Sequence, residues 1–255
     1  MMNKTPFDYI VPDWPAPANV SAVITLRSCG PTQPPYDKFN LAMHVGDDPN
    51  QVIANRSLLR KELNLTLEPL WLDQVHGKEI VYAPSSQRLP SADGAYTNTE
   101  GQACAILTAD CMPVLLCNQQ GTQVAAVHAG WRGLCDGIIS NALQQFSAND
   151  SVMVYLGPAI SAQYFEVGAE VRSAFLSKVT ASNEKELVKK AFVETKNEHY
   201  LADLYALARA ELASRGVSQV YGGEFCSYSQ SAWFYSYRRE KICGRNASLI
   251  WLKSS

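Results

Sequence analysis

Two histidines and one cysteine stand at the ends of apolar runs, where a strand should open into a loop. His76 lies in WLDQVHGKE and His128 in VAAVHAGWRG, each followed closely by glycine, and Cys111 ends the run AILTADC. Two imidazoles and one thiolate bind zinc and leave a fourth position open for water or substrate, which is typical of a catalytic site. A zinc ion there would keep the Cys111 sulfur deprotonated and act as a Lewis acid. The three residues therefore predict a catalytic zinc site.

A hairpin should bring Cys111 and His128 together. Residues 113–117 and 123–129 are apolar runs on either side of NQQG at 118–121, a sequence typical of a turn. Asp93 and Asp110 are candidates to orient the ligands through hydrogen bonds. The spacing alone leaves a second interpretation open, since a buried cysteine is usually an apolar filler and a histidine at a strand end is more often a hydrogen-bonded core residue.

The elements around these residues mix strands and helices. Further short apolar runs predict buried strands at 20–26, 104–109, 152–156 and 248–252. Helices are predicted over 47–63, with Asp48 as N-cap and Pro49 as the first residue, over 132–146, and over 200–216, ending at Gly216. The irregular order favours an α+β (mixed α/β) fold with a mixed or antiparallel sheet over a doubly wound parallel one, in one domain over residues 1–255.

Composition narrows the partners and the compartment. The net charge of −2, without a lysine or arginine run, favours neither nucleic acid nor a membrane surface. The first twenty residues lack the apolar stretch of a signal peptide, no later run is long enough to span a bilayer, and the seven cysteines are scattered, so we expect a cytoplasmic protein with reduced thiols. Cys104, Cys117 and Cys135 are assigned to the core, and His199 to the start of a surface helix. A monomer is expected, because an internal core explains the apolar segments.

Several segments resemble the laccase-domain family of bacterial proteins, also called multicopper polyphenol oxidase, purine nucleoside phosphorylase or peptidoglycan editing factor. They run from about residue 20 to the C-terminus and comprise NLAMHVGDDP, WLDQVHGKE, ADGAYTN, ILTADCMPVLLC, VAAVHAGWRG, YLGPAI, FEVG and SYRR with GR. TADC and HAGWRG at this separation are the most specific combination. The resemblance implies a single layered domain with a mixed sheet flanked by helices, similar in outline to the catalytic domain of cytotoxic necrotizing factor. It also implies that His76, Cys111 and His128 are zinc ligands.

The resemblance further implies phosphorolysis of purine nucleosides and of methylthioadenosine, together with adenosine deamination. Phosphorolysis needs a group that holds phosphate and a means to stabilise the departing base. We expect Cys111, His128 and Arg27 to be catalytic, and the residues expected to bind substrate are Asn40, His44, Arg132 and Arg238. Tyr235 and Tyr237 could stack a base, and Arg132 could instead be a solvated helix residue.

The predicted role of Arg27 comes from the family's TxRxGGVS segment, which resembles TLRSCGPT at residues 25–32. The chain departs from that pattern after the arginine. Cys29, Pro31 and Thr32 replace the usual Gly, Val and Ser. The departure bears on the conformation of this loop and on any contact between its backbone and an anion.

Other functions remain open for the same residues. Cys111 as nucleophile and His128 as base would make an amidase, which fits the peptidoglycan-editing name if the substrate is a UDP-muramyl precursor carrying a wrong serine. Copper oxidase chemistry needs a blue-copper centre and a trinuclear cluster, more than four histidines can supply, so copper replacing zinc would give only weak phenol oxidation. A metal-storage module would bind zinc without turnover.

Overall fold

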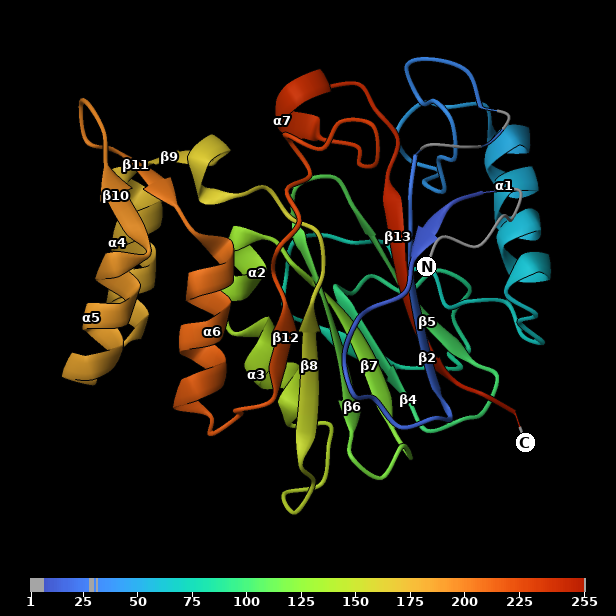
Figure 1. Cartoon of the computed structure of the whole chain (residues 1–255), viewed down its shortest axis with the longest axis horizontal. Coiled ribbons are helices and arrows are strands. Elements are labelled where there is room, and N and C mark those ends of the chain that lie inside the picture. Colours follow the sequence, from blue (N-terminus) through green and yellow to red (C-terminus); the bar gives the residue numbers. More distant parts are fainter. Residues whose placement is uncertain (1–6, 28–29, 31, 255) are drawn as a thin grey trace.

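The computed structural model describes residues 7–27, 30 and 32–254, and its centre is a mixed sheet (Figure 1). Within this part of the chain six strands pair in the order β12-β8-β6-β7-β4-β3. Their bounds are β3 (Ile80–Tyr82), β4 (Gly94–Thr97), β6 (Met112–Asn118), β7 (Val124–Ala129), β8 (Val152–Leu156) and β12 (Val220–Gly222). The pairs β12–β8 and β3–β4 are parallel and the others antiparallel, so the sheet is mixed, as predicted.

A second sheet packs face to face on the first. Its strands are β1 (Tyr9–Ile10), β2 (Val20–Thr25), β13 (Asn246–Leu252) and β5 (Ala103–Thr108), paired antiparallel in that order. Ile24, Ile106 and Ile250 of this sheet pack against residues such as Leu115 and Ala126 of the first. Such burial of one apolar face against another is what stabilises layered sheets.

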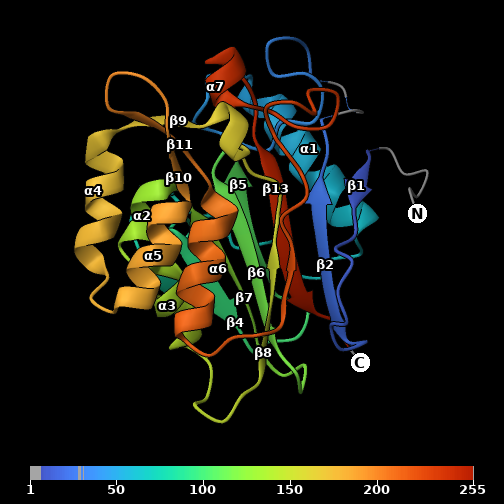
Figure 2. The same cartoon turned by 60° about the vertical axis from the view of Figure 1, so that its left-hand side comes forward.

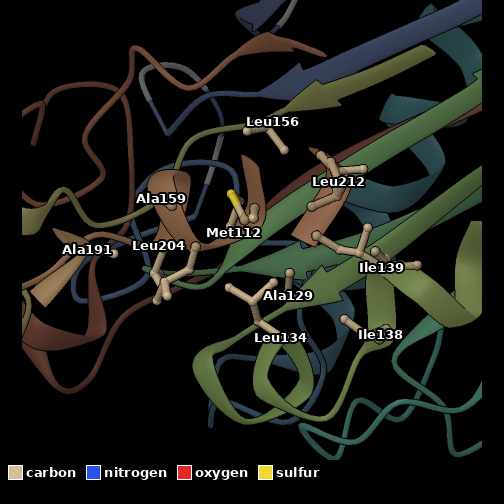
Figure 3. Close-up of a cluster of buried hydrophobic side chains, with 14 of the residues drawn as sticks. Met112, Ala129, Leu134, Ile138, Ile139, Leu156, Ala159, Ala191, Leu204 and Leu212 are labelled. Atoms are coloured by element: carbon tan, nitrogen blue, oxygen red, sulfur yellow. The ribbon is translucent and has the colours of Figure 1, made fainter. Parts of the chain in front are cut away.

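Helices cover the two outer faces. On the second sheet lies α1 (Pro49–Glu62), whose Leu59 packs with Val23 and Leu249. The first sheet is covered by α2 (Trp131–Cys135), α3 (Ile138–Leu143), α4 (Ala169–Lys178), α5 (Ser182–Lys190) and α6 (Leu204–Ser214) (Figure 2). Figure 3 shows how Met112 and Ala129 of the sheet meet Leu134 and Ile138 of α2 and α3. The predicted α+β fold of layered helices and mixed sheet is confirmed.

Smaller elements complete the fold. A small sheet has the order β10 (Phe192–Glu194), β11 (His199–Ala202) and β9 (Glu166–Gly168), and it follows a 3-10 turn at Ala162–Tyr164. The short helix α7 (Tyr237–Glu240) precedes β13. No helix in the described ranges has the length and apolar character of a membrane span.

Most predicted elements are found, and two helices differ. The hairpin of β6 and β7 is present, and α1 begins as predicted, with Asp48 Oδ1 accepting from the Asn50 N–H. The predicted helix over 132–146 is broken into α2 and α3 by Gly137, whose φ of 86° takes the chain out of the helical region. The predicted helix over 200–216 begins only at Leu204, because Asp203 caps it and residues 199–202 form β11. His199 therefore starts an exposed strand and not a helix.

Candidate metal centre

The structure brings His76, Cys111 and His128 together at one end of the β6–β7 hairpin. Cys111 comes directly before β6, and the register pairs Pro113 with His128 near the end of β7. His76 lies in the loop that precedes β3. The centre of its ring lies 4.8 Å from the centre of the His128 ring, at an interplanar angle of 77°. One ligand atom from each residue lies within 4.8 Å of the others. His128 is buried, Cys111 half-buried and His76 exposed, so the group opens to solvent on the His76 side.

Asp93 fixes both histidines. Its Oδ1 lies 2.7 Å from His128 Nδ1 and accepts the His76 N–H at 2.9 Å. Its Oδ2 accepts the backbone N–H groups of Val75 at 3.1 Å and Gly77 at 2.6 Å. Since a carboxylate accepts and does not donate, His128 carries its proton on Nδ1, which leaves Nε2 free to bind a metal. The orienting role predicted for Asp93 fits these bonds.

His76 has an uncommon backbone conformation. Its φ of 60° lies in the left-handed region, which a residue other than glycine adopts at a cost in free energy. The bonds from Asp93 to three successive N–H groups hold the turn in this conformation. Strain of this kind persists only where the surroundings determine it, and it is enriched at ligand sites.

Two glycines of HAGWRG allow the site to close. A Cβ on Gly130 would lie 2.9 Å from Cys111 Sγ and 3.3 Å from His76 Cδ2. A Cβ on Gly133 would lie 2.6 Å from the carbonyl oxygen of Gly77. Any other residue would therefore push α2 away from the His76 turn or fill the space between the ligands. The short distances explain why glycine is needed at both positions.

The thiol and the imidazole shift each other's pKa. Burial disfavours the Cys111 thiolate, but the His128 charge and hydrogen bonds from His128 and His76 outweigh it and lower the pKa of Cys111 to about 6. Burial likewise acts to lower the pKa of His128, but Cys111 and Asp93 outweigh it and raise that pKa to about 9. The Asp93 pKa is lowered, since the hydrogen bonds from His128 and Gly77 outweigh the effect of burial. At neutral pH the metal-free pair therefore favours thiolate and imidazolium.

The donor set fits a metal ion. Zinc bound to nitrogen at ~2.0–2.1 Å and to sulfur at ~2.3 Å in a tetrahedron separates its ligand atoms by roughly 3.5 Å. The three donors, none more than 4.8 Å from another, reach that geometry by small side-chain rotations. Two nitrogens and a thiolate suit zinc and also copper. The group is therefore one that could hold a metal ion with a position left open on its exposed side.

Asp110, next to Cys111, does not orient the ligands as predicted. Its Oδ1 accepts the Ser227 hydroxyl at 2.7 Å, and its Oδ2 accepts the Arg238 N–H at 2.7 Å. The first bond runs to the loop before α7 and the second to α7 itself. Asp110 therefore connects α7 and the preceding loop to the start of β6, which corrects the role predicted from the sequence.

Arg27 and Asn40 are held by the protein itself. Both Nη atoms of Arg27 meet carboxylates, with Glu240 at 2.9 Å and Asp37 at 3.2 Å. The buried Asn40 amide donates to the Ala42 carbonyl and Asp47, and accepts the N–H groups of Ala42 and Arg245. These bonds use the whole amide. Ser28, Cys29 and Pro31 of the departing loop lie outside the described residues.

The two tyrosines expected to stack a base differ in exposure. Tyr235 is fully buried, and its hydroxyl donates to the Tyr36 carbonyl at 2.9 Å and accepts the Phe39 N–H at 3.1 Å. It is a core residue, so the prediction that it stacks a base is wrong. Tyr237 is 50% exposed, with Lys241 Nζ 5.0 Å and the Arg245 guanidinium carbon 5.8 Å from the centre of its ring.

The remaining predicted substrate residues are exposed. The Arg132 guanidinium lies 4.5 Å from the Trp131 ring, with no carboxylate partner in the described part of the chain. Arg238 donates to the Glu166 carbonyl at 3.1 Å. His44 lies close enough to His76 and Arg245 for their charges to help lower its pKa, after the larger effect of burial. Arg245 was not predicted, and its only signal in the sequence is the GR pair within the family-like segments.

Known proteins similar to this chain cover nearly its whole length. A family model described as multi-copper polyphenol oxidoreductase laccase matches residues 21–253. The chain belongs to this family. A protein of Pseudomonas aeruginosa named as a purine nucleoside phosphorylase is 48% identical over 247 residues, covering 96% of this chain and 98% of that protein. The purine nucleoside phosphorylase YfiH of Escherichia coli is 46% identical over 245 residues, covering 95% and 98%.

Solved structures of the family share the fold. A Neisseria meningitidis protein superposes with a TM-score of 0.90 at 43% identity, covering 96% of this chain and 99% of that one. YlmD from Geobacillus stearothermophilus gives a TM-score of 0.89 at 28% identity, covering 100% and 98%. The laccase family membership predicted from the motifs is thus confirmed. The solved structures share the layered fold of this chain.

Proposed function

We propose that this chain is a zinc-dependent purine nucleoside phosphorylase that also cleaves methylthioadenosine and deaminates adenosine. One observation carries the proposal: the His76–Cys111–His128 group lies in a chain that is 46–48% identical to proteins named as purine nucleoside phosphorylases. Zinc held by these residues would supply Lewis-acid polarisation beside the substrate. Copper held by the same residues would add phenol oxidation as a side activity.

The chain's own groups divide the remaining work. Phosphorolysis forms a bond from a phosphate oxygen to the ribose C1 and breaks the bond from C1 to the purine nitrogen, and the base leaves with that electron pair and a proton. We assign phosphate binding to Arg132, because its guanidinium lacks a carboxylate partner among the residues described. Arg132 follows His128 by four residues in the sequence. Arg238 and His44 would add polar contacts to the substrate, whereas the ion pairs of Arg27 and the hydrogen bonds of Asn40 would hold the loops around the site.

Phosphate-dependent release of adenine from adenosine tests the function. The zinc-loaded protein should yield ribose 1-phosphate and adenine, with inosine measuring the deaminase side, and Cys111→Ala should abolish both. Cys135→Ala is the matched control, because Cys135 is also half-buried but lies on α2 away from the ligand group. Folded, zinc-bearing protein that yields neither adenine nor inosine would refute the proposal.

A second candidate has a specific observation in its favour. Asp93, His128 and Cys111 form a hydrogen-bonded series in which the pKa of the thiol is lowered to about 6. Such a series suits a cysteine amidase that acts on a UDP-muramyl precursor carrying serine. A chelator distinguishes the two functions, since it should stop the zinc enzyme and spare the amidase. Iodoacetamide should inactivate the amidase both with and without the chelator. Action as a monomer in the cytoplasm stays a prediction from the sequence.

A further inference from the structure

A cavity of about 580 Å³ lies between α1 and the segment over residues 69–73, which ends three residues before His76. Its apolar lining includes Met43, Ile53 and Leu89, and its polar lining includes His44 and Arg56. Pockets that hold small molecules have volumes of ~300–1,000 Å³ and combine apolar walls with a few convergent polar groups. Both the size and the lining of the cavity meet that description.

The cavity is connected to the metal centre through one short piece of chain. Asp73 lines the cavity, and His76 follows it by three residues. Between them, the Gln74 amide donates to the Leu107 carbonyl and accepts the Leu107 N–H, both at 2.8 Å. Leu107 also lines the cavity. The chain from Asp73 to His76 is therefore held against β5.

His44 lines the cavity and interacts electrostatically with His76. Burial and the charges of surrounding groups lower its pKa, with Asp73 acting in the opposite direction, and these groups are Arg245, Asp73, Arg56 and His76. Asp73 and Arg56 line the cavity with it, and His76 belongs to the metal centre. His44 is thus a lining residue of the cavity that also interacts with His76.

One wall of the cavity is flat and already assembled. The Arg56 guanidinium lies 3.9 Å from the centre of the Trp71 ring, and Arg56 Nε donates to the Leu41 carbonyl at 2.8 Å. Trp71 Nε1 in turn donates to Glu68 Oε1 at 2.9 Å. A planar group can bind such a wall without an entropic cost to order it.

The lining also includes exposed apolar side chains that a ligand would cover. Met43 is 43% exposed, Ile53 54% and Leu89 56%. A purine base has two apolar faces and a polar edge, which matches a lining that combines Met43, Ile53 and Leu89 with the polar Asp73 and His44. We propose that this cavity holds the purine base of the nucleoside, with the ribose directed past His44 toward His76. The assignment rests on the proposed function, since it names the base subsite of that reaction.

Binding of free adenine to the zinc-loaded full chain tests the assignment by calorimetry. Ile53 is exposed on α1, so Ile53→Glu should leave folding intact. The new charge would lie in the apolar lining of the cavity and should weaken adenine binding at least tenfold. Leu187→Glu is the matched control, because Leu187 is 46% exposed on the unrelated helix α5. Leu89→Glu should repeat the effect of Ile53→Glu from the other side of the cavity. Ribose 1-phosphate, which lacks a base, should bind all variants equally.

Asp73→Asn adds a test of orientation. A carboxylate accepts the two N–H bonds of the adenine amino group, so this variant should weaken adenine more than unsubstituted purine, by about fivefold or more. Equal losses for the two bases would overturn the placement of the base edge at Asp73.

The outcomes separate this assignment from the proposed function. Adenine that binds Ile53→Glu and Leu89→Glu as tightly as wild type overturns the cavity assignment, even if phosphorolysis is observed. Adenine binding that these substitutions abolish, in a protein with no phosphorolysis, supports the cavity and refutes the proposed function. Tighter binding of uridine than of adenine would overturn the assignment in favour of a UDP-linked substrate.

Discussion

Asp93→Asn should lower both the stability of the protein and its affinity for zinc, although Asp93 is not one of the three candidate ligands. The substitution keeps the size of the side chain, removes its charge and turns one acceptor oxygen into an NH₂ donor. The carboxylate now accepts two hydrogen bonds at each oxygen, from His76 and His128 at Oδ1 and from Val75 and Gly77 at Oδ2. In either orientation of the new amide, its NH₂ group would face two protein N–H donors, which would lose their acceptor.

The size of the effect follows from these bonds. A hydrogen bond to a charged group contributes ~1.5–3 kcal/mol, so two lost bonds at this fully buried side chain should lower the free energy of unfolding by about 3 kcal/mol or more. For a chain of this length that is a fall in Tm of roughly 6–12 °C. Loss of the group that orients a ligating histidine should also weaken metal affinity by about 10–100-fold.

Zinc affinity is measured by competition with a chelating indicator, and Tm by calorimetry of the metal-free and zinc-loaded forms. Asp110→Asn is the control, because it removes a neighbouring carboxylate that contacts Ser227 and Arg238 but neither histidine. Asp110→Asn should keep the zinc affinity. An Asp93→Asn protein with wild-type zinc affinity would show that the histidines are held without the carboxylate.

Three further predictions concern single positions. In metal-free protein, alkylation of Cys111 by iodoacetamide should rise with pH around a midpoint near 6 and be lost below it, because its pKa is lowered to about 6, whereas Cys104, whose burial raises its pKa, should stay unreacted; a Cys111 midpoint above 8 would contradict this. Gly130→Ala should reduce zinc affinity at least tenfold with little change in Tm, since its Cβ would lie 2.9 Å from Cys111 Sγ, and unchanged affinity would count against the close approach. Tyr235→Phe should cost about 1–3 kcal/mol of stability by chemical denaturation and leave KM for adenosine unchanged, because its hydroxyl bonds only to the protein; a raised KM would restore its role in stacking a base.

The candidate metal-binding group could be predicted because the signals are local. His76, Cys111 and His128 each end an apolar run, and the hairpin that joins two of them needs only a turn between strands. The capped start of α1 is likewise written in adjacent residues, Asp48 and Pro49. Features of this kind depend on neighbours in the sequence, which a pattern can display.

The errors arose where distant partners decide. Tyr235 has the residue type that stacks on a base, but its hydroxyl is bonded to the Tyr36 carbonyl and the Phe39 N–H in the core. No spacing reveals that a polar side chain is already satisfied by a segment two hundred residues away. Gly137 shows the same limit for helices, since a single left-handed residue split one apolar stripe into α2 and α3. The cavity beside His44 draws its walls from five separate segments, so no local pattern in the sequence indicated it.

The carboxylate of Asp93 also bears on how a metal ion would enter the candidate site. Because it holds the His76 turn and the His128 ring by four bonds that involve no ion, the ligands are in place before a metal arrives. Loading and loss of the ion then need no folding or unfolding, unlike in a zinc finger, where binding and folding are one event. The metal content of a purified sample should therefore record the supply of ions during expression and purification, and activities assayed on such samples should change with the growth medium even though the polypeptide is the same.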